Sequence, residues 1–372
     1  MKILALSKEI NRWHGWGRYS FELVQNFRSR NVPMSVFTHR TARNDLLVAD
    51  IAHPILSSVT ESGWRVFFAA FEALRLLPLA SKSTIIHALD ETAVPLAYYL
   101  SRWSKRPFVV TLHGTYCIEA VTGSKRRQFK KMFRAASGLI AVSDYTRRRF
   151  LEHMPEIESR VKVIPLGVSP ELIDQEIRGI EARKPILLNV GAVKKRKGVL
   201  HAVRALGALR DVVPSARLVV VGGFDKRDPY VVEVLQESER LGLAARVILL
   251  GEVDEATLSS LYRESRALVV PSQNAGTHFE GFGLVHLEAA AKGLPTIGSL
   301  NCGNEEVIVD GYTGFLVGQS DQETLSYRMK QLLVDDGLWR RFSIAAIERA
   351  KAMSWGKAAD ETYCFLQTFS RS

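Results

Sequence analysis

The stretch that decides the fold is Glu280-Gly-Phe-Gly-Leu-Val-His-Leu-Glu288, which continues as Ala-Ala-Ala-Lys-Gly-Leu-Pro295. A buried strand is predicted just upstream, at 267–271, and a polar loop joins the two. From Leu284 onward the apolar residues fall at helical spacing, and Gly293 followed by Pro295 is typical of a helix end. The order is therefore strand, glycine-rich loop, helix. Such a helix directs unpaired backbone N–H groups at the loop, which favours an anion there.

Two carboxylates bracket this loop. Glu280 lies at its mouth, and Glu288 projects from the helix just over one turn beyond the helix start, so the two do not share one helix face. An isolated pair at this spacing is more simply an acid that favours the helix dipole and an acid on the surface. Here the pair is part of a longer motif, which favours a ligand site.

The motif E-G-F-G-L-x-x-L-E-A-A-A-x-G-L-P resembles the donor-sugar motif of glycosyltransferase family 4, a large family of retaining transferases that use nucleotide sugars. The resemblance implies that Glu288 binds the ribose hydroxyls of the nucleotide and that Glu280 contacts hydroxyls of the donor sugar. It also implies that backbone amides of the loop and helix start face the sugar and the diphosphate. These residues are Gly281, Phe282, Gly283 and Leu284.

The charge of the chain is unevenly distributed. Of its 372 residues 47% are hydrophobic, which is enough for the cores of two domains. Lys and Arg outnumber Asp and Glu by 26 to 16 over residues 1–180, but only by 24 to 23 over the remainder. The basic first half indicates an anionic partner. A membrane of anionic lipid or a lipid-diphosphate acceptor fits better than nucleic acid, because no nucleic-acid-binding module is recognisable.

Cysteine usage and hydropathy indicate the compartment. Cys117, Cys302 and Cys364 show no metal-ligand spacing and cannot all pair, which suits a reducing environment. No signal peptide is apparent, and the longest apolar stretch, 64–80, carries three charged residues and Pro78, which makes it a poor membrane span. We therefore expect a cytoplasmic protein that is peripheral at the inner face of the cytoplasmic membrane.

A second glycine-containing loop, Gly15-Trp-Gly17-Arg-Tyr, follows the apolar strand predicted at 2–7. Strand, loop and helix in this order suit a phosphate, although a plain turn is as common. The stretch resembles the G-G-x-G-R loop of the same family, which closes over donor and acceptor. Trp13 and Trp16 lie in this region. They either pack under the loop or contact the acceptor or a membrane, and the sequence does not choose between these alternatives.

His113 follows the strand predicted at 108–112. A histidine at the carboxyl end of a parallel strand lies where such sheets bind ligands. For an isolated residue, a structural histidine is the simpler interpretation. The T-L-H-G context resembles the histidine of the family's cleft, which implies contact with the donor sugar or the incoming acceptor.

Two amphipathic helices are predicted in the first half. The apolar stripe of one comprises Trp64, Phe67, Phe68, Phe71 and Leu74, and we expect it to face the core, with docking on a bilayer as the alternative. The other spans 124–136 and contains six basic residues and no acidic one. Its basic face is either simply solvated or docks on an anionic membrane, where each charge adds about 1 kcal/mol. That face comprises Arg127, Lys130, Lys131 and Arg134.

Four consecutive bases, Lys194 to Lys197, follow a strand predicted at 185–190 that ends in Gly191. Such a cluster before a helix suits a diphosphate, with a solvated basic turn as the alternative. The spacing resembles the family's G-x5-K-G pattern, which implies that Arg196 and Lys197 bind phosphate. Many members have Arg directly after the first Gly, where this chain has Ala192.

Short apolar strands alternate with helices in both halves, which predicts parallel sheets covered on both faces. We expect two Rossmann-like domains, an acceptor-binding one at 1–169 and a nucleotide-sugar-binding one at 185–352, joined by a charged linker at 170–184. Residues 353–372 should form a helix that packs back on the first domain. The resemblance covers nearly the whole chain and implies the GT-B arrangement, with the two sheets facing across a cleft.

The resemblance implies transfer of a hexosyl group from a nucleotide diphosphate sugar to a hydroxyl of a glycan or lipid-linked acceptor, with retained anomeric configuration. The catalytic residues would be His113, Arg196, Lys197 and Glu280, acting largely by electrostatic stabilisation of the leaving diphosphate. The chain has no D-x-D triplet, so we expect neither a metal nor another cofactor. Lipopolysaccharide or exopolysaccharide assembly is the expected pathway.

Three other functions share this fold. A sugar-nucleotide epimerase would consume the donor without an acceptor. A phosphorylase needs a lysine for pyridoxal phosphate, and no motif supports one. A catalytically inactive or regulatory protein would bind the donor without turnover, and Ala192 in place of the usual Arg is consistent with this alternative.

Overall fold

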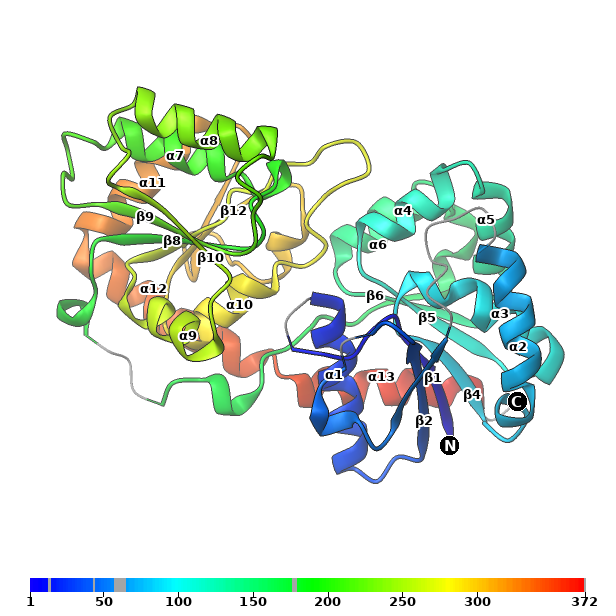
Figure 1. The fold of residues 1–372 in the computed structure, drawn as a ribbon. Helices are drawn as coiled ribbons and strands as arrows, with labels where there is room; N and C mark the ends of the chain where they lie inside the picture. Colours follow the sequence, from blue (N-terminus) through cyan, green and yellow to red (C-terminus); the bar gives the residue numbers. More distant parts are fainter. Residues whose placement is uncertain (13–14, 43, 57–64, 176–178, 371–372) are drawn as a thin grey trace. The chain divides into compact units, whose positions relative to one another are not determined.

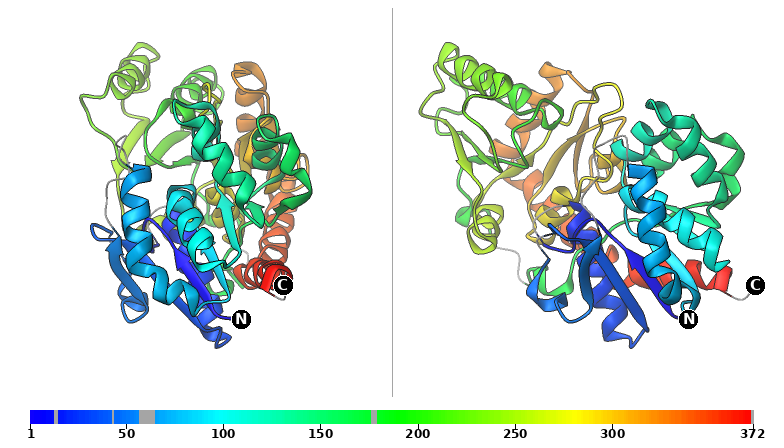
Figure 2. Two further views of the ribbon diagram at one scale, coloured as in Figure 1. Left: turned by 90° about the vertical axis from the view of Figure 1, so that its right-hand side faces the viewer. Right: turned by 45° about the vertical axis from the view of Figure 1, so that its right-hand side comes forward.

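The chain divides into two compact units, each built on a parallel β-sheet with helices on both faces (Figure 1). The computed structural model describes residues 1–372 except 13–14, 43, 57–64, 176–178 and 371–372, and it leaves the side chains of 65–67 undescribed. The first unit comprises Met1–Leu166 and Trp355–Ser372, and the second comprises Gly167–Ser354. Figure 2 shows from two further sides that helices flank both sheets.

The sheet of the first unit has seven strands in the order β3-β2-β1-β4-β5-β6-β7, and all neighbours are parallel. These are β1 (Ile3–Leu6), β2 (Met34–His39), β3 (Ala52–Leu56), β4 (Ile85–Ala88), β5 (Phe108–Leu112), β6 (Gly138–Ala141) and β7 (Val161–Val163). Every residue of β1, β4, β5 and β6 is buried, which explains why the central strands read as continuous apolar runs. The edge strand β3 contains Pro54 and exposed residues, so the sequence alone does not predict it.

The C-terminal helix belongs to the first unit. The helices of this unit are α1 (Gly15–Ser29), α2 (Arg65–Ser81), α3 (Val94–Ser104), α4 (Thr115–Thr122), α5 (Arg126–Ala135), α6 (Asp144–Leu151) and α13 (Trp355–Ser370). Helix α13 lies along α1, where the rings of Phe27 and Tyr363 are 6.0 Å apart and Arg30 pairs with Asp360 at 3.0 Å. Helix α13 is therefore part of the packing of the first unit, although it lies far from α1 in the sequence.

Helix α2 corrects one sequence expectation. Phe71 and Leu74, predicted to face the core, are 52% and 58% exposed, and Phe68 is exposed as well. The buried face of α2 instead comprises Ala69, Ala73, Leu76 and Ala80. Small side chains at helical spacing let α2 pack closely on α3, so the large side chains of the same helix point outward. Trp64 lies outside the described residues, and the side chain of Phe67 is not described.

The sheet of the second unit has six parallel strands in the order β10-β9-β8-β11-β12-β13. They are β8 (Ile186–Val190), β9 (Arg217–Val221), β10 (Val247–Gly251), β11 (Ala267–Val269), β12 (Thr296–Ser299) and β13 (Gly314–Val317). The helices are α7 (Val199–Ala208), α8 (Pro229–Arg240), α9 (Glu255–Glu264), α10 (Leu284–Ala291), α11 (Gln322–Val334) and α12 (Asp336–Ala352). Among the described residues of this unit, two separate apolar clusters form the core.

Several helices begin where the sequence supplies a capping side chain. The Ser143 hydroxyl accepts a hydrogen bond from the Thr146 amide at the start of α6, and the Asp254 carboxylate accepts one from the Thr257 amide at the start of α9. Across the described residues, no helix is both long enough and apolar enough to cross a bilayer.

The strand order places the candidate site. In the second unit the order reverses between β8 and β11, and loops at the carboxyl ends of the strands flanking such a switch point bind ligands in open parallel sheets. The loop after β8 contains the basic cluster, and the loop after β11 contains the glycine-rich motif. In the first unit the switch lies between β1 and β4.

Candidate functional site

The loop after β8 brings a basic turn onto the end of the sheet. Its residues Lys195–Lys197 form a single 3-10 turn that ends at Gly198, the first residue before α7. Gly198 has φ of +67°, and a Cβ there would lie 1.9 Å from the carbonyl oxygen of Pro271. Only glycine permits this conformation and this close approach to the next loop. The stem of Lys197 packs beside Gly191, so Lys197 is buried although its neighbours Lys194 and Lys195 are exposed.

Lys197, Arg196 and Glu280 form an ion-paired cluster. Lys197 Nζ donates to Glu280 Oε2 at 2.5 Å, and Arg196 Nη1 lies 3.3 Å from the same oxygen. Burial opposes ionisation of Glu280, but the two cations outweigh it and hold the pKa of this carboxyl below its ordinary value. The structure thus brings together three of the predicted site residues, and Glu280 is ionised at neutral pH.

The glycine-rich loop leads directly into α10. Gly283 precedes the helix with φ of +85°, and the carbonyl of Glu280 accepts a hydrogen bond from Gly303 at 2.7 Å. Phe282 is buried beneath the loop, and Leu284 is the first helical residue. The first amides of a helix have no partner within it, so the start of α10 offers N–H groups beside the ionic cluster. This arrangement suits an anion bound next to Lys197.

Glu288 is held separately from this cluster. It projects half-buried from α10, and its Oε2 accepts a hydrogen bond from the hydroxyl of Tyr262 on α9 at 3.2 Å. Tyr262 is itself buried. The sequence gives no indication of this contact, because a tyrosine on the helix before β11 carries no local signal of a role at the site.

His286 and Asn304 form a further polar layer at the loop that the sequence does not predict. A Cβ on Gly283 would lie 2.6 Å from Asn304 Oδ1 and 3.0 Å from His286 Cδ2, so both side chains pack against this glycine. Among the described residues neither the ring nitrogens of His286 nor the side-chain amide of Asn304 finds a hydrogen-bond partner. Burial lowers the pKa of His286 to about 3, so its ring is neutral.

In the first unit His113 lies at the carboxyl end of β5. Its Nε2 is 2.8 Å from the carbonyl oxygen of Leu89, an acceptor, so Nε2 carries a proton. Burial lowers the pKa of His113, against the effect of the bond to Leu89. The ring is therefore neutral and its Nδ1 is the acceptor nitrogen. The Tyr19 ring packs edge-on to His113 with ring centroids 4.8 Å apart.

Glu91 is a buried acid beside His113, and the sequence gives no signal for it. It follows β4, and its Oε1 accepts a hydrogen bond from the backbone amide of His113 at 2.5 Å. Burial raises the pKa of Glu91 to about 8. At neutral pH Glu91 is thus largely protonated and fixes the backbone that carries His113.

Gly15 and Gly17 lie in the first turn of α1 rather than in a loop, so the sequence expectation of a glycine loop at these two positions is wrong. A Cβ on Gly17 would lie 2.5 Å from Asn11 Oδ1, so a larger residue there would displace the buried side chain of Asn11. Trp16 packs against Tyr116, with ring centroids 4.3 Å apart, and lies 6.4 Å from the His113 ring. Trp13 lies outside the described residues. Their contact with donor or acceptor stays a prediction.

The basic face of α5 is partly used inside the first unit. Lys130 Nζ donates to the carbonyl of His153 at 2.9 Å, and Arg134 pairs with Glu156 at 2.7 Å. Arg127 and Lys131 are exposed. The opposite face is buried and consists of Phe129, Met132 and Phe133. Among the described residues, no cluster of three or more His, Cys, Asp or Glu side chains is arranged to hold a metal ion.

Comparison with known proteins follows the division of the chain. Residues 13–172 match the family model described as Glycosyltransferase Family 4, and residues 172–349 match the model described as Glycosyl transferases group 1. The two models together cover the chain from residue 13 to residue 349.

Two curated relatives illustrate the likeness in sequence. The chain is 30% identical over 245 residues to a D-inositol 3-phosphate glycosyltransferase of Nocardiopsis dassonvillei, covering 62% of this chain and 56% of that protein. It is 28% identical over 257 residues to a GDP-mannose-dependent alpha-(1-6)-phosphatidylinositol monomannoside mannosyltransferase of Mycolicibacterium smegmatis, covering 65% and 66%. The chain thus spans 56% and 66% of the length of these relatives.

Solved structures share the fold over the whole chain. The HepE protein of Anabaena in complex with UDP has a TM-score of 0.82 at 21% identity, covering 99% of this chain and 100% of that one. The lipopolysaccharide outer core galactosyltransferase WaaB has a TM-score of 0.76 at 17% identity, with 99% of each chain covered. The two Rossmann-like domains therefore have the GT-B fold, as predicted. From these matches we conclude that the chain belongs to glycosyltransferase family 4.

Proposed function

We propose that this protein transfers a hexosyl group from a nucleotide diphosphate sugar to an acceptor hydroxyl, with retention of the anomeric configuration. The observation that carries the proposal is the Arg196, Lys197 and Glu280 cluster beside the N-terminus of α10. It combines cations and helix amides for a diphosphate with a carboxylate that accepts hydrogen bonds from sugar hydroxyls.

The positive charges would stabilise the leaving group. As the bond between sugar and diphosphate breaks, negative charge builds on the diphosphate, and fixed cations at that place lower the barrier. Lys197 is buried and Arg196 only half-exposed, so both act where water screens them less. Glu280 offsets one of their two positive charges, and a bound diphosphate would interact with the remaining one.

The ionised state of Glu280 argues against a role as a general acid. Glycoside hydrolases need a carboxylic acid whose pKa is raised so that it can protonate the leaving oxygen. The cations lower the pKa of Glu280 instead. We assign Glu280 to orienting the donor sugar, Glu288 to the ribose hydroxyls and the neutral His113 to contact with the sugar or the incoming acceptor.

The names of the relatives suggest which classes of donor and acceptor to test. The two curated relatives are named for inositol phosphate and phosphatidylinositol mannoside acceptors, and one uses GDP-mannose, whereas HepE is bound to UDP. We propose a UDP- or GDP-hexose donor and a glycan or lipid-linked acceptor, in lipopolysaccharide or exopolysaccharide assembly. No metal or other cofactor enters this proposal.

We further propose that the first unit docks peripherally on the inner face of the cytoplasmic membrane. Phe68, Phe71 and Leu74 form an exposed apolar face on α2, which packs on α3, and α3 in turn contacts the basic helix α5. Arg127 and Lys131 remain exposed on α5. Exposed apolar side chains on one helix and exposed cations on another helix of the same unit suit an anionic bilayer surface, which would hold a lipid-linked acceptor within reach.

The test is a thermal-shift panel of UDP, GDP, ADP and CMP sugars in EDTA, on wild type, Glu288→Ala and the control Glu239→Ala, which changes an exposed acid of α8. A donor at about 100 Kd should stabilise the wild type and the control by about 2.7 kcal/mol and leave Glu288→Ala unshifted. If no sugar nucleotide stabilises the wild type, the transferase assignment loses its support.

A turnover measurement then distinguishes a transferase from an epimerase and from a catalytically inactive protein. Product NMR with an acceptor present should show a new glycosidic bond of the donor's anomeric configuration. Consumption of the donor without acceptor would instead identify an epimerase. Ala192, in place of the Arg that is usual in the family pattern, is consistent with the inactive alternative, which predicts binding in the thermal-shift panel but no turnover.

A further inference from the structure

We propose that Tyr262 is the positioning residue for Glu288, and that an ionic clamp between α9 and α10 sets this contact before any nucleotide binds. The inference rests on the proposed function, because it concerns how Glu288 binds the ribose of the donor. It adds a residue outside the glycine-rich motif to the donor site.

The contact itself is specific. Tyr262 donates its hydroxyl to Glu288 Oε2 at 3.2 Å, and Tyr262 is only 3% exposed. A glutamate side chain has several rotatable bonds, and a hydrogen bond from a buried phenol restricts the carboxylate to one orientation. A carboxylate accepts through two oxygens, so a group fixed at Oε2 also fixes the direction in which Oε1 accepts.

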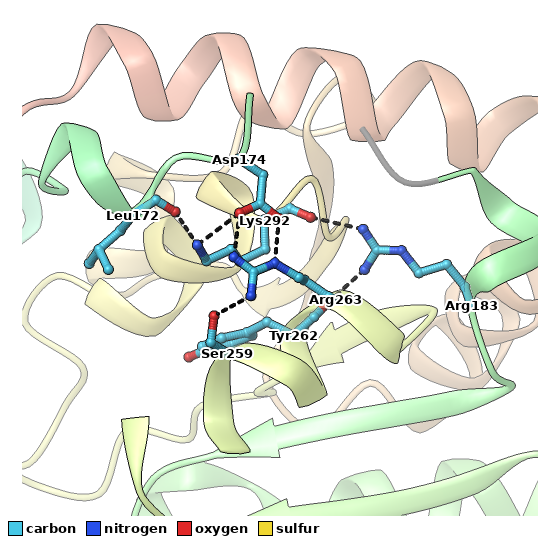
Figure 3. A network of polar contacts seen from close by, with 7 residues as sticks. All are labelled: Leu172, Asp174, Arg183, Ser259, Tyr262, Arg263 and Lys292. Atoms are coloured by element: carbon cyan, nitrogen blue, oxygen red, sulfur yellow. Dashed lines mark hydrogen bonds and ion pairs between the residues drawn. The ribbon is translucent and has the colours of Figure 1, made fainter. Parts of the chain in front are cut away.

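The helix that carries Tyr262 is tied to the helix that carries Glu288. The buried guanidinium of Arg183 donates to the carbonyl of Tyr262 at 2.6 Å and to the carbonyl of Lys292 at 2.8 Å (Figure 3). Lys292 directly follows α10, four residues after Glu288. One side chain thus joins the end of α9 to the end of α10.

Asp174 adds a second tie between the same two helices, as Figure 3 shows. Its carboxylate accepts two hydrogen bonds from Arg263, at 2.6 and 2.7 Å, and pairs with Lys292 Nζ at 3.0 Å. Lys292 Nζ also donates to the carbonyl of Leu172. Arg263 is the residue next to Tyr262. Both sets of contacts therefore act close to the hydrogen bond between Tyr262 and Glu288.

Together these contacts form a preorganised pair. Arg183 and Asp174 fix the spacing of α9 and α10, and this spacing brings the Tyr262 hydroxyl to Glu288. A carboxylate that is already oriented loses less conformational freedom when the ribose binds, which increases affinity. The ligand class for this pair is the vicinal diol of a nucleoside diphosphate.

The experiment measures whether Tyr262 acts through the ribose. The probe is whichever of UDP, GDP, ADP and CDP binds wild type most tightly, together with its 2′,3′-dideoxy counterpart. Wild type should prefer the ribose form, and Tyr262→Phe should weaken binding of that form about tenfold. Binding of the dideoxy form should be the same in both proteins. In turnover, KM for the donor should rise by a similar factor with little change in kcat.

Tyr312→Phe is the matched control, because Tyr312 makes the same kind of contact, from its hydroxyl to Glu348 Oε2 at 3.4 Å, on an exposed part of the same unit. It should leave the preference for the ribose form unchanged. A purely structural role for Tyr262 would weaken both nucleotides equally and would overturn the inference.

The outcomes also separate the inference from the proposed function. If wild type prefers the ribose form and Glu288→Ala loses the preference, but Tyr262→Phe keeps it, the inference fails while the donor site stands. If wild type binds no nucleoside diphosphate, or does not discriminate the dideoxy form, the assignment of Glu288 to ribose fails and the inference falls with it.

Discussion

Lys197 Nζ lies 2.5 Å from Glu280 Oε2, although the two residues are 83 positions apart in the chain. The loops that carry them follow β8 and β11, which are neighbouring strands, so the pairing of these strands creates the contact. Lys197 is buried and the Glu280 side chain is only 15% exposed, so each charge stabilises the other where water screens them little. The proposed diphosphate and sugar would therefore meet charges that are already in place.

Removing the Lys197 charge should reduce catalysis much more than removing a neighbouring charge. We expect Lys197→Ala to lower kcat/KM by about 100-fold or more, because in the proposed mechanism this fixed charge stabilises the leaving diphosphate. Steady-state kinetics with the donor identified by thermal shift would measure this. Lys195→Ala is the control: it removes the same charge from an exposed position of the same turn, and a comparable loss there would contradict the assignment.

Asp174→Asn should destabilise the second unit. The substitution leaves Lys292 and Arg263 without their counter-charge, and Lys292 is buried, so we expect the free energy of unfolding to fall by about 2 kcal/mol. Chemical denaturation would measure the difference. Asp211→Asn, in a highly exposed pair with Arg210, should change stability by less than about 0.5 kcal/mol.

The effect of Asp174 should depend on pH. Burial opposes its ionisation, but Arg263 and Lys292 outweigh this and lower its pKa in the folded protein. Its contribution is therefore present above its ordinary value of 3.8 and is lost as pH falls through the lower folded value. The stability difference between wild type and Asp174→Asn should be constant from pH 5 to 8. A difference that persists undiminished in acid would show that the ion pairs do not cause it.

Glu91→Gln should become increasingly stabilising relative to wild type as pH rises. Because burial raises the pKa of Glu91 to about 8, the folded protein keeps its proton between about pH 4.5 and 8 while the unfolded chain loses it. The unfolded state then binds fewer protons, so wild-type stability falls over this range, by up to about 1.4 kcal/mol per pH unit. Gln has the shape of the neutral acid and keeps the bond from His113.

Melting temperatures of wild type and Glu91→Gln between pH 6.5 and 9 test this. Burial lowers the pKa of His87 to about 3, so the free energy of unfolding falls in acid as the unfolded chain takes up a proton at this residue. Measurements above pH 6.5 keep this effect separate from that of Glu91. Glu152→Gln, at an exposed residue of the same unit, should show no pH trend in its difference from wild type. A flat difference for Glu91→Gln as well would mean that Glu91 is ionised in the folded protein.

Replacing Phe71 and Leu74 together by Ser should weaken binding to anionic vesicles without reducing stability. Both side chains are more than half exposed, so the change in unfolding free energy should stay within about 0.5 kcal/mol. Co-sedimentation with phosphatidylglycerol vesicles, at low and high salt, measures the membrane contact. Val232→Ser removes an exposed apolar side chain from the second unit and should have no effect. Equal binding by all three proteins would argue against docking through α2.

Large parts of the fold follow from local sequence. The central strands read as continuous apolar runs because both of their faces are covered, and the strand predicted at 108–112 has the observed bounds of β5. Helix α10 begins at Leu284, where its periodicity predicts. The sequence does not predict the edge strand β3, because Pro54 interrupts its apolar pattern. It also does not predict that the large apolar side chains of α2 face outward, because alanines form most of the packing face of this helix.

The sequence by itself determined the family, the two sheets and the motif that places Glu280 and Glu288 around a helix start. These depend on residue types at short spacing, which act through backbone geometry and hydrogen bonding close by in the chain. Only the tertiary structure decided that Lys197 neutralises Glu280, that Tyr262 holds Glu288, and that Glu91 keeps its proton. Each of these depends on burial and on charges brought close by strand order, and neither quantity is written in the local pattern.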